Sequence, residues 1–230
     1  MKKTVMALSG GMDSATLLGM LLEQGGEVHC CTFYYGSKHG KWENRAAEDL
    51  IDFYQYKRKF PVFGHVIDLS GAMKDFQSDL LLSGGEIPEG HYEDASMQQT
   101  VVPGRNMIFA AIIAGLAESV GAGQIALGVH SGDHHIYPDC RKEFIKALDS
   151  AVYLSSDRKV EVIAPLIDMN KTSILCDGLR LKVPYQLTRT CYKDQELSCG
   201  RCGSCIERLE AFAEIGMNDP IWYEVPLGVM

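Results

Sequence analysis

The sequence predicts an α/β fold with a single doubly wound, mostly parallel sheet and a small four-cysteine module at its C-terminal end. Short apolar runs typical of buried strands alternate with helix-period patterns along most of the chain. The 230 residues are enough for one substantial core. Half of the 8 cysteines are gathered near the C-terminus. We therefore expect a main domain over residues 1–184 and a helical module over 185–230, packed as one compact unit.

Five short apolar runs predict the strands, at residues 4–8, 27–34, 63–69, 124–129 and 160–164. Helical patterns follow these runs, at residues 15–22, 43–54, 106–119, 140–154 and 171–180. Strands that alternate with helices favour parallel pairing with right-handed crossovers. Residues 83–104 interrupt the alternation, and a connection of that length is usually a functional lid or a mobile loop.

Ligands of such sheets bind at the carboxyl ends of the strands, beside the point where the strand order switches. The loops after the first and fourth predicted strands, residues 9–13 and 128–139, are therefore expected to flank the binding crevice. Candidate functional residues are expected mainly in these loops and in the helix starts beside them.

Composition and charge restrict the classes of partner. The chain is 46% hydrophobic and 23% charged, which is ordinary for a globular protein. A formal net charge of −8 argues against a broad nucleic-acid-binding surface, which would need a basic face. No apolar run approaches the roughly 20 residues that cross a bilayer, and the N-terminus lacks the apolar core of a signal peptide. We expect a cytoplasmic protein without nucleic-acid or membrane partners.

A glycine-rich loop, Ser9-Gly10-Gly11-Met12-Asp13-Ser14, joins the first predicted strand to the first helix. Such a turn presents backbone N–H groups and the positive end of a helix dipole to an anion. Asp13 and Ser14 stand where a helix N-cap belongs, so capping is a further role for them. The loop is neither a Walker A motif nor a dinucleotide fingerprint. An ordinary turn would tolerate almost any small polar residues, so two glycines among two serines and an aspartate favour a phosphate site.

Cys191, Cys199, Cys202 and Cys205 form the second strong motif. Bunched cysteines in a cytoplasmic chain indicate a metal rather than disulfides. Four thiolates suit tetrahedral zinc, and a closed four-sulfur shell leaves no open position for catalysis. An iron–sulfur cluster also takes four cysteines, and free thiols are the remaining alternative. The short loops between the cysteines favour structural zinc.

Two basic residues open predicted helices near the crevice. Arg105 follows the long connection, and a cation at a helix start opposes the helix dipole, which favours a phosphate or carboxylate contact. An exposed arginine beside a turn is the alternative. Lys171 could reach phosphates as a point charge, although many such lysines are only solvated.

The segment over residues 128–141 carries many polar side chains behind the fourth predicted strand. A metal site is disfavoured there because His134 and His135 are adjacent and would point apart on a regular element. Asp139 could bind a ligand or could equally cap a helix.

The glycine-rich loop resembles the Ser-Gly-Gly-x-Asp-Ser loop of the PP-loop ATP pyrophosphatases, which typically adenylate a substrate oxygen. The set of motifs as a whole resembles one family among them, the 7-cyano-7-deazaguanine synthases. The shared segments occur in the same order, from about residue 4 to about residue 212: the loop, Val-Pro-Gly-Arg-Asn at 102–106, Asp133 with Tyr-Pro-Asp-Cys-Arg at 137–141, Pro165-Leu166 with Lys171, and the four cysteines.

The resemblance implies a Rossmann-like PP-loop ATPase fold and an ATP-dependent carbon–nitrogen ligase. Such an enzyme converts 7-carboxy-7-deazaguanine and ammonia to 7-cyano-7-deazaguanine through an amide, in queuosine-type deazapurine biosynthesis. A carboxylate oxygen is a poor leaving group, so ATP would activate it as a mixed anhydride that ammonia can attack. A second activation, of the amide oxygen, would permit elimination to the nitrile. The protein would supply positioning and neutralisation of phosphate charge.

The resemblance also implies roles for particular residues. Catalytic roles fall on Asp13, Ser14, Arg105 and Lys171. ATP, with magnesium, would be held by Leu8, Ser9, Gly10, Gly11, Met12, Asp13, Ser14, Ala15, Thr16, Leu17 and Leu18, together with Arg105, Asn106 and Gly128. The deazaguanine would be held by Asp133, Tyr137, Asp139 and Arg141, an acidic side chain pairing with its N–H donors. Zinc would be held by Cys191, Cys199, Cys202 and Cys205. A homodimer is also implied, with Trp222 and Tyr223 as reasonable interface residues.

The chain departs from the family pattern near the expected base pocket. Ser37 stands where many relatives carry glutamine, and residues 134–136 are His-His-Ile where relatives often have small residues. The alternatives are therefore a related enzyme that stops at the amide or modifies tRNA directly, and a non-catalytic nucleotide-binding module. Whether ATP leaves as AMP with pyrophosphate or as ADP with phosphate stays open.

Overall fold

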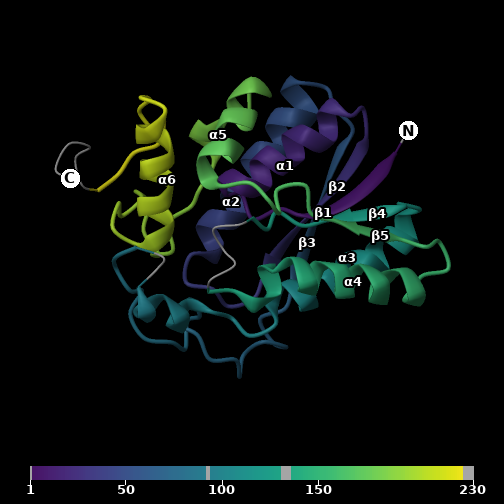
Figure 1. Ribbon diagram of the computed structural model, residues 1–230, viewed down its shortest axis with the longest axis horizontal. Coiled ribbons are helices and arrows are strands. Elements are labelled where there is room, and N and C mark those ends of the chain that lie inside the picture. Colours follow the sequence, from purple (N-terminus) through teal and green to yellow (C-terminus); the bar gives the residue numbers. More distant parts are fainter. Residues whose placement is uncertain (1, 92–93, 131–135, 225–230) are drawn as a thin grey trace.

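The computed structural model describes residues 2–91, 94–130 and 136–224. Five strands form one sheet in the order β3-β2-β1-β4-β5 (Figure 1). Their bounds are β1 Lys3–Ala7, β2 Glu27–Tyr34, β3 Val62–Asp68, β4 Gln124–Ala126 and β5 Glu161–Ile163. Every neighbouring pair is parallel, and the strand order switches between β1 and β4. The predicted doubly wound parallel sheet is confirmed.

Helices cover both faces of this sheet (Figure 1). Their bounds are α1 Met12–Glu23, α2 Gly40–Asp52, α3 Arg105–Val120, α4 Lys142–Ser155, α5 Lys171–Arg180 and α6 Gly203–Glu214. α3 and α4 pack on one face, where the core includes Ile113 and Leu148. α1, α2 and α5 pack on the other face, around Leu18 and Leu50. α6 lies beside α5 and adds Phe212 to this second core.

Short helical turns occur in the connections. A π-helical turn, η1 Phe53–Lys57, extends α2. The 3-10 turns are η2 Ala95–Thr100, η4 Pro138–Cys140 and η5 Tyr185–Leu187. The long connection predicted over residues 83–104 therefore contains η2, whose Met97 and Thr100 are buried. Part of that connection is packed against the domain, and its role as a lid stays a prediction.

α3 is apolar around most of its circumference. By length and composition alone, the stretch Ala95–Val120 is apolar enough to cross a membrane. Within α3, however, Phe109, Ile113 and Ala117 are buried in the core cluster on the sheet. This is the packing of a core helix in an α/β domain.

A buried ion pair connects α6 to the rest of the molecule. The Arg208 guanidinium donates to the two carboxylate oxygens of Asp219 at 2.6 and 2.9 Å, and both side chains are 0% exposed. The same guanidinium donates to Thr188 Oγ1 at 2.7 Å and to the Tyr185 carbonyl at 3.2 Å. The Tyr185 hydroxyl lies 2.7 Å from Thr16 Oγ1 on α1. One hydrogen-bonded network therefore runs from α6 into the core of the α/β domain.

Replacing Arg208 with methionine should lower the free energy of unfolding by roughly 3–5 kcal/mol, because the Asp219 carboxylate would remain buried without its cation. Urea unfolding of the purified variant measures this loss. The double change Arg208→Met with Asp219→Asn should recover part of it, since no charge then stays buried alone. A single-variant loss below about 1 kcal/mol would show that the pair is no more than a surface-type contact.

Candidate functional site

One cavity lies at the carboxyl ends of β1, β2 and β4. The loop after β1 forms one side, and the N-terminal turns of α2, α3, α5 and α6 contribute the others. The positive ends of several helix dipoles therefore approach a single space, which favours an anionic ligand. Both loops that were predicted to flank the crevice reach this cavity, through Asp13 and Tyr137.

The glycine-rich loop is held by its own serines and by α2. Ser9 Oγ and Ser14 Oγ are 3.1 Å apart, and the Gly11 N–H donates to Ser9 Oγ at 3.3 Å. Gly10 has a φ of +77°, and a Cβ there would lie 2.7 Å from the Glu43 carbonyl oxygen on α2. Only glycine suits both the backbone angle and this close approach, so the loop backbone rests directly on α2.

The N-terminus of α1 is open toward an anion. Gly11 is its N-cap, and no side chain caps the helix. Asp13 and Ser14 lie in the first helical turn, so the capping role that the sequence suggested for them was wrong. The Ser14 hydroxyl donates instead to the Gly11 carbonyl at 3.2 Å. Uncapped N–H groups at a helix start, next to a glycine turn, are typical of a phosphate site.

Asp13 belongs to a charged cluster in the cavity. Lys171 Nζ, at the start of α5, lies 2.9 and 2.7 Å from the two carboxylate oxygens of Asp13. It also lies 3.2 Å from His130 Nε2 and 3.0 Å from the Glu207 carboxylate. Desolvation raises the pKa of Asp13, but Lys171 and His130 outweigh it, so the pKa lies below its usual value. Asp13 is therefore an anion that is held next to a cation.

Arg105 reaches the cavity from α3, whose N-cap Gly104 has a left-handed φ of 64°. Its Nη1 donates to the Tyr35 hydroxyl at 3.3 Å. The guanidinium carbon lies 5.9 Å from the ring centroids of both Tyr35 and Tyr137. Aromatic contacts of this kind orient a guanidinium without neutralising its charge.

The residues predicted to hold the substrate lie in different surroundings. Tyr137 is buried and lines the cavity. The Asp139 carboxylate accepts the backbone N–H of Asn106 at 2.9 Å, at the start of α3. Arg141 is exposed and does not line the cavity. Asp133 lies outside the described residues.

The residues predicted to hold ATP also separate into groups. Those that line the cavity are Leu8, Ser9, Gly11, Met12, Asp13, Ser14, Arg105, Asn106 and Gly128. Those that are buried in α1, away from the cavity, are Ala15, Thr16, Leu17 and Leu18. Gly128 brings the end of β4 close to the loop, since a Cβ there would lie 3.5 Å from the Ser14 Cα.

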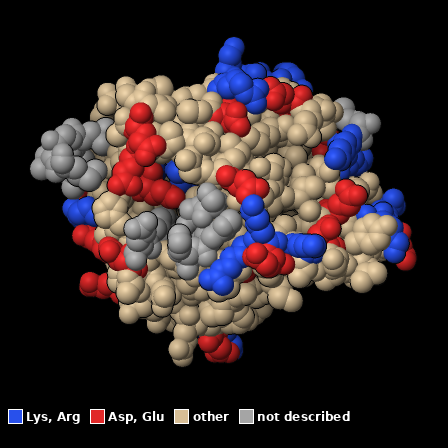
Figure 2. Space-filling view, in the orientation of Figure 1, with Lys and Arg blue, Asp and Glu red and all other residues tan. Residues whose placement is uncertain are grey.

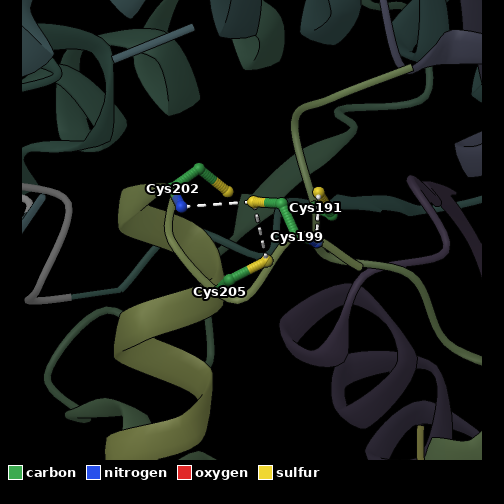
Figure 3. A group of neighbouring side chains, drawn as sticks. All are labelled: Cys191, Cys199, Cys202 and Cys205. Atoms are coloured by element: carbon green, nitrogen blue, oxygen red, sulfur yellow. Dashed lines mark hydrogen bonds between the residues drawn. The ribbon is translucent and has the colours of Figure 1, made fainter. Parts of the chain in front are cut away.

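The four clustered cysteines bring their sulfurs together at the start of α6 (Figure 3). All four are buried, and their Sγ atoms lie within 4.8 Å of one another. Tetrahedral zinc with bonds of about 2.3 Å separates its sulfur ligands by about 3.8 Å. The sulfurs of Cys199 and Cys205 are 3.9 Å apart. Backbone N–H groups of Cys199 and Cys202 donate to cluster sulfurs at 3.3 Å, which favours thiolates. The cluster can hold a metal ion.

Arg189 joins this cluster to the glycine-rich loop. Its backbone N–H donates to the Gly10 carbonyl at 2.8 Å. Its guanidinium donates to the carbonyls of Gln195 and Glu196, both at 2.6 Å, within the loop that leads to Cys199. One residue therefore holds both the glycine-rich loop and the loop that leads to Cys199.

Comparison with known proteins shows the family of this chain. The family described as queuosine biosynthesis protein QueC matches residues 3–216. The chain belongs to the QueC family. This QueC-family chain is 45% identical over 225 residues to a 7-cyano-7-deazaguanine synthase of Caldicellulosiruptor bescii, covering 98% of this chain and 99% of the relative. It is 43% identical to the 7-cyano-7-deazaguanine synthase of a Marinomonas species, covering 97% and 99% of the two chains.

Solved structures support the fold of the QueC-family chain. NMN synthetase from Francisella tularensis superposes with a TM-score of 0.51 at 14% identity, covering 94% of this chain and 77% of that one. A 4-thiouridine synthetase, solved with RNA and bound ATP, gives a TM-score of 0.50 at 21% identity, covering 91% and 50%. At these identities the likeness concerns the PP-loop type of α/β fold alone.

Several residues of this QueC-family chain that line the cavity or contact its charged side chains were not found from its sequence. His130 follows β4 in a segment that was singled out, and its Nε2 lies 3.2 Å from Lys171 Nζ and 3.7 Å from a carboxylate oxygen of Asp13. Glu207 comes from α6, whose bounds no sequence pattern gave. His39, Glu43 and Asn44 line the cavity from the start of α2, where the spacing of His39 and Glu43 is the sole sequence signal.

Surface charge is mixed on the face shown in Figure 2. Acidic side chains gather at the upper left of this view, and a small basic group with acidic neighbours lies near its centre, over a mostly uncharged surface. Charge on this face therefore provides no broad electrostatic footprint for a nucleic acid.

Proposed function

We propose that this chain uses ATP to convert 7-carboxy-7-deazaguanine and ammonia to 7-cyano-7-deazaguanine through an amide. Membership of the QueC family, with relatives of over 40% identity named 7-cyano-7-deazaguanine synthase, supports the reaction. The observation that carries the proposal is the glycine-rich loop at the end of β1, with Lys171 against Asp13 in the same cavity.

In the proposed site, the loop Ser9–Ser14 holds the triphosphate. Its uncapped helix start and glycine backbone supply N–H donors, and Lys171 supplies a cation. The ionised Asp13 carboxylate is a suitable oxygen ligand for the magnesium that accompanies ATP. When a phosphate group enters, Lys171 can exchange part of its contact with Asp13 for the phosphate oxygens. Its ion pairs with Asp13 and Glu207 hold its ammonium group in place.

Arg105 is proposed to neutralise negative charge at the substrate end of the cavity, where the carboxylate is activated. Its contacts with the rings of Tyr35 and Tyr137, and its hydrogen bond to the Tyr35 hydroxyl, hold its direction before substrate binds. Tyr137 lines the proposed substrate side, and Asp139 supports it from outside the cavity lining by accepting the Asn106 N–H. Asp133 lies outside the described residues. No side-chain nucleophile is needed, because ammonia attacks the activated carbonyl carbon and the phosphate-linked oxygen leaves. The chain orients the reactants and balances their charge.

The four-cysteine cluster is proposed to hold structural zinc. The spacing of the sulfurs encloses a single tetrahedral ion more readily than a multi-iron cluster, which supports zinc over an iron–sulfur centre. Residues 185–230 are proposed as a zinc-binding module on a catalytic domain of residues 1–184. The hydrogen bond between Arg189 and Gly10 supports packing of the two as one unit.

The proposed compartment is the cytoplasm, which the free thiols of the described cysteines support. The proposed assembly is a homodimer. Trp222, at 82% exposed, is a suitable contact residue, whereas the Tyr223 hydroxyl already donates to Asp219 at 2.6 Å.

Mass spectrometry of a reaction with 7-carboxy-7-deazaguanine, ATP and ammonium tests the proposal directly. We expect the nitrile as final product, with the amide appearing first. Amide alone would indicate a related enzyme that stops halfway. Absence of both products, together with no release of phosphate or pyrophosphate above background, would overturn the proposal in favour of a binding module.

A further inference from the structure

A buried polar group with unused hydrogen-bonding capacity lines the cavity beside the glycine-rich loop. His39 is 1% exposed and Asn44 is 2% exposed. Within the described part of the chain, neither ring nitrogen of His39 and neither amide atom of Asn44 has a hydrogen-bond partner. Buried polar atoms without partners cost free energy, so a cavity lined by several of them indicates a ligand that pairs with them.

Glu43 adds a carboxylate to this group. One of its oxygens lies 3.4 Å from His39 Nε2, and its side chain also lines the cavity. The backbone of Glu43 contacts the loop at Gly10, so the group stands directly beside the proposed phosphate site. A carboxylate at this position repels phosphate groups and attracts N–H donors or a cation.

The unpaired atoms of His39 and Asn44 distinguish a cation from a ligand with N–H donors. Magnesium or ammonium would use the acceptors of Glu43 and Asn44. Either cation would still leave the Asn44 NH2 group, and one N–H of His39, without an acceptor. A ligand that presents donors and acceptors on one edge matches the whole set.

Resting on the function proposed above, we propose that His39, Glu43 and Asn44 form the subsite that reads the hydrogen-bonding edge of the deazaguanine ring. That edge carries a ring N–H and an exocyclic amino group as donors and a carbonyl oxygen as acceptor. The Glu43 carboxylate accepts the two donors, and the Asn44 NH2 group donates to the carbonyl. The His39 ring adds one further donor and one further acceptor. The Tyr192 ring, whose centroid lies 5.2 Å from that of the His39 ring, adds an apolar wall.

This assignment separates the two anionic parts of the reaction. The reacting carboxylate lies across the bicyclic ring from the edge that meets Glu43, so the two negative charges are kept apart. Adenine is disfavoured in the same subsite, because its unprotonated ring nitrogen would face the Glu43 carboxylate. Asp139 is less suited to pair with the ring donors, since its carboxylate already accepts the Asn106 N–H.

Steady-state kinetics of Glu43→Gln in the full, metal-loaded chain test the subsite. We expect the KM for 7-carboxy-7-deazaguanine to rise about 10- to 100-fold, because a charge-assisted pair of hydrogen bonds is lost. The KM for ammonium and the Kd for ATP should stay within about 2-fold of wild type. Glu48→Gln, an exposed change on the same helix, is the matched control and should leave all three values unchanged.

Calorimetric binding of the same compound and of its analogue without the exocyclic amino group needs no turnover and no variant. The wild-type chain should bind the analogue about tenfold more weakly or worse, and Glu43→Gln should bind the two alike. Equal binding of both compounds by wild type overturns the subsite. So does a Glu43→Gln variant in which only the ammonium KM changes, since that result indicates a cation site. If wild type discriminates between the compounds but forms no product, the subsite stands and the proposed reaction fails.

Discussion

Cys202→Ala should abolish metal binding and lower the free energy of unfolding by an amount on the order of 10 kcal/mol, the contribution typical of a structural zinc site. Three remaining sulfurs cannot close a tetrahedral shell. The four cysteines also connect the start of α6 to the loop that Arg189 holds, so loss of the metal would release both segments. Metal analysis and chemical unfolding of the purified chain measure both effects. Because the loss is comparable to the whole stability of a typical domain, we expect the variant to be largely insoluble.

Cys176→Ala is the matched control, since Cys176 is exposed and lies outside the cluster. It should retain the full metal content and the stability of wild type. A Cys202→Ala chain that is soluble, metal-free and active would rule out a structural metal at this cluster.

Lys171→Met should reduce ATP-dependent product formation by at least about a thousandfold. Lys171 is the cation that the structure holds against Asp13 in the loop, and removal of one preorganised electrostatic contact commonly costs a factor of about 100 to 1,000. Here the methionine also leaves the Asp13 and Glu207 carboxylates without the charge that separates them, which adds repulsion toward the phosphates. Release of phosphate and pyrophosphate, followed with saturating substrate, measures the loss.

Two variants make that result specific. Lys142→Met changes a lysine that is exposed and away from the cavity, and it should retain activity. Lys171→Arg keeps the positive charge but not the compact ammonium group, so it should retain only part of the activity that Lys171→Met loses. If Lys171→Met binds ATP and turns over within about tenfold of wild type, Lys171 has no role in the reaction and its contact with Asp13 is structural.

The sequence was sufficient for the sheet and for the residues that come directly after its strands. Apolar runs and glycine turns are local features, so β1, the loop with Asp13, and the position of Tyr137 could be read from them. The bunched cysteines were equally local. Lys171 could be predicted near the phosphates because α5 begins there, although its pairing with Asp13 could not.

Residues that depend on packing between distant segments could not be predicted. Glu207 and Arg208 lie on α6. Glu207 reaches Lys171 only because α6 packs beside α5, and Arg208 reaches Asp219 only because the chain after α6 folds back on it. His39 and Asn44 face the cavity because Gly10 lets the loop rest on α2, a contact between segments that no periodicity reveals. The N-cap of α1 was mistaken because Gly11 already holds an extended conformation that starts the helix.

The hydrogen bond from Arg189 to Gly10 has a thermodynamic consequence for a cell that is short of metal. If ATP bound at the glycine-rich loop stabilises this bond, ATP should raise the affinity of the sulfur shell for its ion by the same factor by which the ion raises the affinity for ATP, because linkage of two binding equilibria is reciprocal. A chain with bound ATP should then retain its ion at a higher concentration of a competing chelator than a chain without ATP. When metal is scarce, chains with bound ATP would therefore lose their ion last.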